Sequence, residues 1–305
     1  MTDIIGHSGV LADILSLLRV RQWTKNLFCL AGVVFGGRYA SPPDLATAAL
    51  VFLSFCLAAS AVYVGNDIHD AAHDRNHPKK RNRPISAGRI SNGFAVVLMV
   101  ACLIGSLVIA ASTTWVLLAA ILAYLANNVL YNRWLKRIAI LDVLSITMGF
   151  VLRLLAGIYA LNDIPTAWIV LCVFFLSSFL GFAKRRAELN GILERNPRGF
   201  DVGLQRPALA GYSVTYLDLL VTGTATMTVI CYALFAAVSH KNPSLIVTVP
   251  FVFYAVMHYQ RMLMSTAYGE EPETVALTDP HLVVTGGLWF ITFMTIWVGQ
   301  FHFFK

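Results

Sequence analysis

Charged residues are scarce in this chain. Only 13% of its 305 residues are Asp, Glu, Lys or Arg, whereas 57% are hydrophobic. Soluble domains carry about 25% charged residues, so the composition argues against a soluble protein. It predicts an all-α polytopic membrane protein, because long apolar runs recur along the chain.

Cysteines are also few, and their positions indicate no disulfide framework. All five lie within apolar runs, which indicates packing residues rather than a disulfide set or a metal motif. The sequence shows no internal repeat, low-complexity tract or appended soluble domain, so we predict one integral-membrane domain over residues 1–305. Acidic residues interrupt the first eighteen positions, which argues against a cleavable signal there.

Nine apolar runs are long enough to cross a bilayer as helices. They cover residues 24–40, 45–66, 93–112, 114–132, 141–160, 165–183, 212–238, 244–263 and 282–302. Of the 23 Lys and Arg residues, Arg38, Lys241 and Lys305 fall on one side and Arg153 within a run, which leaves 19 on the other side. The positive-inside rule places that richer side, with the N-terminus, in the cytoplasm. We therefore predict a multi-pass protein of the cell inner (plasma) membrane.

The net charge of +7 follows from this topology and needs no nucleic-acid partner. Basic cytoplasmic loops attract anionic membrane lipids, and they also favour an anionic substrate.

Polar residues are concentrated where the second apolar run ends, in the segment NDIHDAAHDRNHPKKRNRPISAG of residues 66–88. If the preceding helix continues, Asp67, Asp70 and Asp74 lie on one face with the amide of Asn66 beside them. Three carboxylates on one stripe repel one another unless a cation lies among them. Mg²⁺ prefers such oxygen ligands, completed by substrate phosphates. The alternative is an ordinary positive-inside loop that happens to hold acids.

Basic residues follow these aspartates in the same segment. Lys80, Arg81 and Arg83 stand where guanidinium and ammonium groups can bind phosphate oxygens. The segment thus predicts a magnesium diphosphate site at a membrane surface. A structural zinc site is an alternative for three histidines at helical spacing, although their stripe is turned away from the aspartates: His69, His73 and His77.

Two charges belong to the fifth apolar run. Asp142 opens it, where an aspartate either complements the helix dipole or takes part in a site. Arg153 lies eleven residues later, three turns on and nearly on the same face. An arginine inside an apolar helix costs roughly 2.5 kcal/mol or more. We expect it either to pair with a carboxylate such as Asp218 or to hold a substrate phosphate.

Two more loops on the cytoplasmic side carry polar residues. Lys184 and Arg185 belong to the run GFAKRRAEL, of which one or two side chains can enter a site. Tyr212 follows the next loop and is a core aromatic by default, although its hydroxyl is able to reach a polar ligand. The loop AYGEEPETVALTDP is acidic and forms either a solvated surface or an acceptor for sugar hydroxyls.

The chain resembles a known family at these motifs. NDIHDAAHD fits the NDxxDxxxD signature of the UbiA superfamily of intramembrane transferases, and KKRNRPISAG resembles the basic stretch after it. YNRWLKR is similar to a tyrosine–lysine–arginine motif in the superfamily's second conserved loop. The resemblance runs over essentially the whole chain. It implies a UbiA-like bundle of nine transmembrane helices with the active site on the cytoplasmic side.

The remaining motifs resemble one branch of that superfamily. Aromatic prenyltransferases usually carry a second DxxxD, but here Ile146 follows Asp142 at the fourth position. The segments RVRQWTKN, FVLRLLAG, KRRAEL and GEEPETVAL look instead like decaprenyl-phosphate phosphoribosyltransferases. These move 5-phosphoribose from PRPP to a polyprenyl monophosphate, a step toward cell-wall polysaccharide.

The resemblance also implies roles for individual residues. Mg²⁺ on the pyrophosphate of PRPP would be held by Asp70 and Asp74, with Asn66 and Asp67 supporting them. Substrate binding would fall to the other polar residues named for the cytoplasmic side, together with Lys25 and the arginine of the fifth run: Lys25, Lys80, Arg81, Arg83, Asp142, Arg153, Lys184, Arg185 and Tyr212.

Two other functions stay open on the sequence alone. A UbiA-type prenyltransferase would use the same aspartates to move a prenyl group from a prenyl diphosphate to an aromatic or other acceptor. A transporter would use Arg153 and Asp218 as pathway residues, although the charges cluster on one side and no inverted repeat is visible. Association into a homo-oligomer also stays open.

Overall fold

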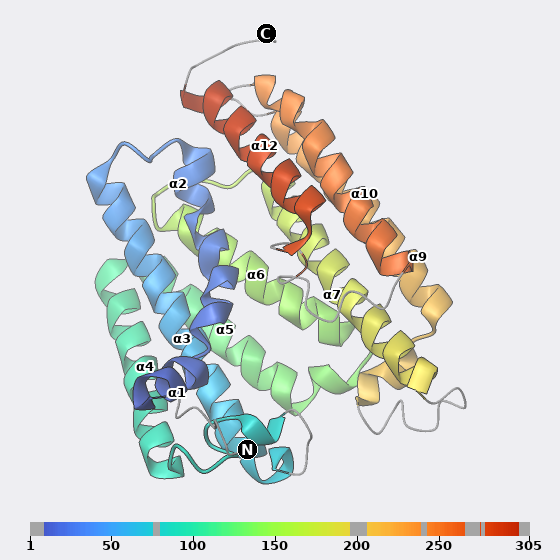
Figure 1. Cartoon of the computed structure of the whole chain (residues 1–305). Helices are drawn as coiled ribbons and strands as arrows, with labels where there is room; N and C mark the ends of the chain where they lie inside the picture. Colours follow the sequence, from blue (N-terminus) through green and yellow to red (C-terminus); the bar gives the residue numbers. More distant parts are fainter. Residues whose placement is uncertain are drawn as a thin grey trace, which may run out of the picture. The chain divides into compact units, whose positions relative to one another are not determined.

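The computed structural model describes residues 9–75, 80–195, 206–238, 243–265, 275 and 278–298. Every regular element in these ranges is a helix, which confirms the predicted all-α class for the described part of the chain (Figure 1). The chain divides into two compact units, residues 1–128 with 152–164 and residues 129–151 with 165–305. The single domain predicted from the sequence stays a prediction.

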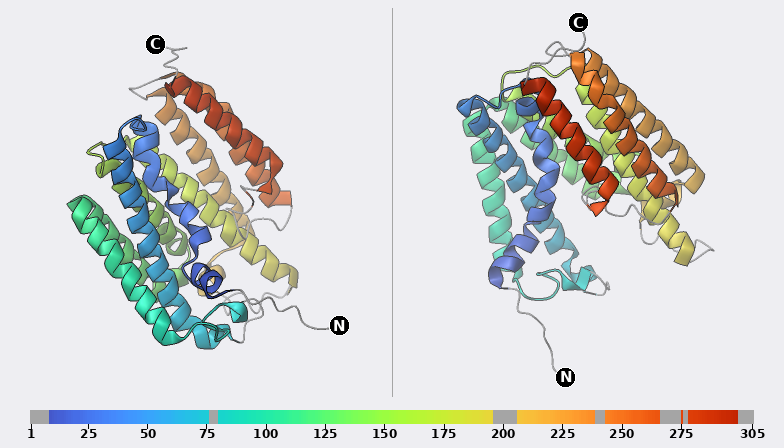
Figure 2. Two further views of the ribbon diagram at one scale, coloured as in Figure 1. Left: turned by 60° about the vertical axis from the view of Figure 1, so that its left-hand side comes forward. Right: turned by 45° about the horizontal axis from the view of Figure 1, so that its top comes forward.

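The first unit is built around one long helix, α3, which lies along α4 (Figure 2). Phe55 of α3 is fully buried and packs with Leu117 and Ile121 of α5. The elements of this unit are α1 (Val10–Leu17), η1 (Val20–Leu30), α2 (Ala31–Gly36), α3 (Pro42–Asp74), η2 (Lys80–Asn82), α4 (Asn92–Thr113) and most of α5 (Trp115–Arg133).

The sequence explains why α3 starts abruptly and runs far. The Ser41 hydroxyl accepts a hydrogen bond from the backbone N–H of Asp44, and prolines occupy the first turn, where they cost a helix little. The helix then continues for 33 residues to Asp74. At about 1.5 Å per residue it is roughly 50 Å long, against roughly 30 Å for a hydrocarbon core. The expectation that this helix continues through the aspartates is confirmed.

η1 is a 3₁₀ helix of eleven residues, which is long for this type. Side chains three apart eclipse one another in a 3₁₀ helix, so Trp23, Asn26 and Cys29 form one row. The Trp23 indole donates to the Ser60 hydroxyl at 3.1 Å, and Cys29 is fully buried. This row attaches the chain's first apolar stretch to α3.

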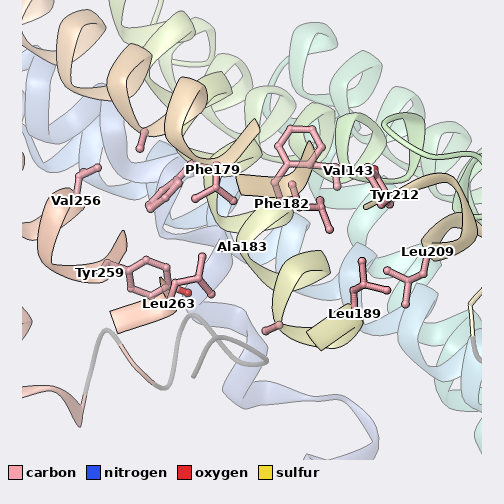
Figure 3. Packing of buried hydrophobic residues seen from close by; sticks show 14 of the residues in the cluster. Val143, Phe179, Phe182, Ala183, Leu189, Leu209, Tyr212, Val256, Tyr259 and Leu263 are labelled. Carbon is pink, nitrogen blue, oxygen red and sulfur yellow. The ribbon is translucent and has the colours of Figure 1, made fainter. Parts of the chain in front are cut away.

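The second unit packs α7 along α9, with α10 against both α9 and α12. Its core gathers aromatic and aliphatic side chains from α6, α7, α9 and α10, including Leu217 of α9. Figure 3 shows Phe179, Phe182 and Tyr259 of this core. The elements are η3 (Leu135–Arg137), the first part of α6 (Leu141–Tyr159), α7 (Ala167–Arg195), η4 (Pro207–Gly211), α9 (Val214–Ala237), η5 (Pro243–Thr248), α10 (Val249–Ser265) and α12 (Pro280–Val298).

Six helices of the described residues are long and apolar enough to cross a membrane, namely α3, α4, α5, α6, α7 and α9. The chain is therefore an integral membrane protein, but nine spans are not confirmed. The other three predicted runs fold as η1 with α2, as η5 with α10, and as α12. The 3₁₀ rise of about 2.0 Å per residue gives η1 and α2 a combined length of roughly 31 Å if they are collinear. Nine spans stay a prediction.

Gly157 of α6 allows the second half of that helix to touch the first apolar stretch. A Cβ atom built at Gly157 would lie 1.9 Å from the carbonyl oxygen of Cys29. Because the Cys29 oxygen belongs to the backbone and a Cβ would be fixed to the Gly157 Cα, no flexible side chain can move away to relieve the clash. Two helical segments of the first unit thus depend on a residue without a side chain.

We expect Gly157→Ala to destabilise the protein by about 1–3 kcal/mol, the usual range for overpacking a filled interior. Thermal unfolding in detergent would report this as a lower Tm. Gly223→Ala on α9 is the matched control, because a Cβ there meets nothing within 4 Å. Equal Tm values for the two variants would contradict the close contact.

Candidate active site

The predicted metal-binding residues lie on the last turns of α3. Asn66, Asp70 and Asp74 are four residues apart, so they follow one another along one face of the continuous helix. Asp67 and Asp74 are buried, with 3% and 1% of their surface exposed, whereas Asp70 is half-buried. The helix therefore places one accessible carboxylate between two shielded groups.

Two arginines neutralise the shielded carboxylates. Arg83 Nη1 lies 2.7 Å from Asp74 Oδ2 and 3.1 Å from Asp67 Oδ1, so one nitrogen bridges both. Arg19 Nη2 lies 2.6 Å from the same Asp67 oxygen, and its guanidinium also stacks 4.7 Å from the centre of the Tyr63 ring. Lys80 adds a longer contact of 3.9 Å to Asp74. The corner is thus an ion cluster rather than a bare acidic patch.

Asp70 differs from its two neighbours. It has no hydrogen-bond or ion-pair partner among the residues that the structure describes. A half-buried carboxylate without a counter-ion is a favourable place for a cation. Asn66, one turn earlier, offers an amide oxygen, and both are the hard ligands that Mg²⁺ takes.

The described residues bring no zinc site together. His69 and His73 are exposed on α3, while His77 lies outside the described residues. Within the described part of the chain, no three His, Cys, Asp or Glu side chains surround a common point. A site with few protein ligands suits Mg²⁺ better than zinc, because substrate phosphates and water usually complete magnesium coordination.

Arg153 is buried in the first unit, where it contacts an amide and two aromatic rings. Its Nε donates to Asn26 Oδ1 at 2.6 Å, and its Nη2 donates to the Tyr124 hydroxyl at 3.1 Å. The ring faces of Tyr124 and Phe55 also lie 4.7 and 5.8 Å from the guanidinium carbon. The alternative partner suggested by the sequence, Asp218, forms an ion pair with Arg186 in the second unit. These contacts fix the guanidinium in place inside the first unit.

The second unit contains its own polar cluster, centred on Asp142 and Arg185. Arg185 Nε lies 2.8 Å from Asp142 Oδ2, and both side chains are almost fully buried. The Tyr212 hydroxyl donates to the other Asp142 oxygen at 2.7 Å and accepts the Ile140 N–H at 2.5 Å. That bond stabilises Ile140, a β-branched residue held at φ 71°.

Glu188 extends this cluster one turn along α7. It pairs with Arg185, and Arg206 approaches it at 2.8 Å. Arg206 also donates to the Tyr131 hydroxyl at 3.0 Å. Arg185 therefore belongs to an internal network and not to an open cationic surface.

Four other predicted residues are more accessible. Lys25 is half-buried on η1, and Lys80 and Arg81 are exposed on η2. Lys184 is half-buried on α7 and makes no ion pair with any described residue. As the sequence suggested, the three consecutive cations of α7 point to different surroundings.

Sequence reasoning missed the anchoring role of Arg19, Asn26 and Arg206. Arg19 and Asn26 open and close the RVRQWTKN segment, which the sequence analysis singled out without indicating which residues its side chains contact.

In the acidic loop, Asp279 accepts the N–H of Leu282 and contacts His258 at 3.2 Å. Those contacts hold its pKa below the ordinary aspartate value. The glutamates of that loop lie outside the described residues.

Comparison with known proteins decides the family. Residues 26–278 match the UbiA prenyltransferase family, a range that covers most of both units. The chain belongs to the UbiA prenyltransferase family. A UbiA homologue from Archaeoglobus fulgidus, solved with GPP and Mg²⁺, has the same fold, with a TM-score of 0.68 at 21% identity over 94% of this chain and 98% of that one.

Curated UbiA-family relatives are closer in sequence. The decaprenyl-phosphate phosphoribosyltransferase of Mycolicibacterium smegmatis is 34% identical, over 92% of this chain and 91% of the relative. The enzyme of that name from Mycobacterium tuberculosis is 32% identical, over 93% and 94%. The superfamily resemblance noted at NDIHDAAHD is thereby confirmed.

We expect Arg185→Met to destabilise the second unit by about 3–5 kcal/mol, because it leaves the buried Asp142 carboxylate without its cation. Thermal unfolding would show the loss as a lower Tm. Lys184→Met is the adjacent control and is expected to change Tm little. A stable Arg185→Met variant would show that this ion pair does not support the fold.

Proposed function

We propose that this protein transfers 5-phosphoribose from PRPP to a polyprenyl monophosphate such as decaprenyl phosphate, with release of pyrophosphate. The relatives that carry this activity in their names align over more than nine-tenths of the chain. The reaction joins a water-soluble donor to a lipid acceptor, and an integral membrane protein suits both. We place the site, with the N-terminus, on the cytoplasmic side of the plasma membrane, because the nine-run topology predicted from the sequence puts most Lys and Arg residues on that side.

The observation that carries the proposal is the row of Asn66, Asp70 and Asp74 on α3 beside the basic η2 segment. The donor set fits Mg²⁺, since it offers carboxylate and amide oxygens and few of them. When bound, the ion would supply positive charge to the pyrophosphate oxygens as they leave C1 of the ribose. Asp67 supports the row from the adjacent position, where Arg19 holds it.

The basic residues of the first unit complete the electrostatics. Arg83, Lys80 and Arg81 follow α3 and are suited to the oxygens of the pyrophosphate. Arg153 and Lys25 supply further positive charge, Arg153 from a buried position fixed by Asn26. PRPP carries a pyrophosphate and a separate 5-phosphate, so it needs more cations than one metal ion provides.

The acceptor requires little proton chemistry. A lipid phosphate is already an anion, so its attack on C1 needs no strong general base. Attack from the face opposite the leaving group inverts the anomeric centre. Positioning and preorganised charge then supply most of the rate.

In the second unit, the sequence assigns substrate binding to Asp142, Lys184, Arg185 and Tyr212, and these roles stay proposals. Asp142 is paired with Arg185 and accepts the Tyr212 hydroxyl. A carboxylate paired with an arginine that is almost fully buried, and so cannot move away, is a poor ligand for a second metal. Ile146 also stands where a second aspartate would be. This favours PRPP over a prenyl diphosphate held by two metal sites.

The decisive test offers two donor–acceptor pairs to the purified protein with Mg²⁺. One tube contains labelled PRPP with decaprenyl phosphate, and the other contains a labelled prenyl diphosphate with 4-hydroxybenzoate. We expect label to enter the lipid phase only from PRPP and EDTA to abolish it. Product in the second tube alone would reassign the aspartates to a prenyl diphosphate.

We also expect Asp70→Asn and Asp74→Asn each to lower Mg²⁺-dependent turnover roughly a hundredfold or more, a loss of about 2.7 kcal/mol of transition-state stabilisation. Initial rates at saturating PRPP measure this. Asp44→Asn, in the first turn of the same helix, is the control and should retain the wild-type rate. Normal turnover in the Asp70 and Asp74 variants would remove the metal site from α3.

A further inference from the structure

Arg83 occupies the position that a cation would take between two of the α3 aspartates. A single nitrogen, Nη1, lies 2.7 Å from Asp74 and 3.1 Å from Asp67. Both carboxylates are almost completely buried, so each needs a counter-ion whenever no metal is present. The Arg83 guanidinium satisfies that need.

The two buried carboxylates of this corner already have cationic partners within the protein. Arg19 and Arg83 pair with Asp67, and Arg83 and Lys80 pair with Asp74, whereas Asp70 has no such partner among the described residues. A bare divalent ion would add two positive charges beside the Arg83 guanidinium, and the repulsion between them would weaken its binding. A divalent ion that arrives with a diphosphate brings negative charge as well, and the phosphate oxygens offer Arg83 a new partner.

The two sides of the Arg83 contact differ in freedom. Asp67 and Asp74 are fixed on a long helix, and their side chains are 5% and 1% exposed. Arg83 follows the short η2 turn, and its side chain is 28% exposed. The guanidinium is therefore the group able to change partner. Arg19 stays on Asp67 through its ion pair and its stacking on Tyr63.

We propose that Arg83 is an internal counter-ion that excludes bare divalent metal from Asp74. When metal and diphosphate bind together, Arg83 moves away from Asp74 and binds the phosphate oxygens instead. This inference rests on the metal site of the proposed function. It makes Arg83 a positioning residue that sets the order of binding. The substrate is then the metal–diphosphate complex, and free metal ion binds weakly.

Two binding measurements on the purified protein test this without turnover. Electron paramagnetic resonance follows Mn²⁺ binding alone, and retention of labelled inorganic pyrophosphate is measured with Mn²⁺ present. For Arg83→Gln we expect bare Mn²⁺ to bind about tenfold more tightly and pyrophosphate about tenfold more weakly than in the wild type. A damaged fold would weaken both, so opposite changes identify the exchange of partners.

Three variants sharpen the result. Arg83→Lys keeps the positive charge and should still exclude bare Mn²⁺, whereas Arg89→Gln removes an arginine of the same loop that pairs with Asp13 and should change neither affinity. The inference is overturned if wild-type protein binds bare Mn²⁺ as tightly as Arg83→Gln does, or if Arg89→Gln reproduces the Arg83→Gln result. Asp70→Asn, introduced into the Arg83→Gln variant that binds bare Mn²⁺ more tightly, tests the metal site separately: lost Mn²⁺ binding supports that site, and retained binding refutes the site itself.

Discussion

The pairing of carboxylates with guanidinium groups at the ends of apolar helices is the constraint on which this structure depends. A helix that crosses lipid can carry charge only where water or an opposite charge meets it. In the first unit, Arg19 and Arg83 meet Asp67 and Asp74 where α3 ends. In the second, Arg185 meets Asp142 where α6 begins. Each unit therefore concentrates its polar chemistry at a helix terminus.

These two clusters have different chemical capacities. The α3 cluster includes a partly exposed arginine and a carboxylate, Asp70, that has no partner among the described residues, which are the features that the proposed exchange of cations needs. The α6 cluster is closed, because Arg185 is 2% exposed and pairs with two acids of its own unit. The first arrangement suits ligand exchange, and the second suits a fixed scaffold. Similar residue types thus serve different purposes according to burial.

Local sequence rules predicted much of the fold and part of the site. Helical spacing placed Asp70 and Asp74 on one face, and α3 does continue through them. The same reasoning placed Lys184 and Arg185 on a helix facing different surroundings. It missed the 3₁₀ winding of η1 because its cause is tertiary: the row containing Trp23 and Asn26 bonds to α3.

Partners distant in sequence were also beyond local rules. Nothing near Arg83 in the chain indicates that one nitrogen bridges Asp67 and Asp74, and nothing near Asp142 points to Tyr212, seventy positions later. Such contacts depend on how the chain returns upon itself. The sequence supplied the chemical inventory of the site, and the tertiary fold determined which charges are already matched.

The backbone at Arg19 has a consequence for protein engineering. Arg19 adopts the left-handed conformation, with φ 52°, which disfavours any residue that has a side chain. A stabilisation campaign that replaces such residues by glycine would select position 19 along with Ile140 and Asn162. Glycine at position 19 would relax the backbone, but it would also remove the guanidinium that pairs with Asp67. Thermostability and charge matching therefore make opposing demands on this single residue.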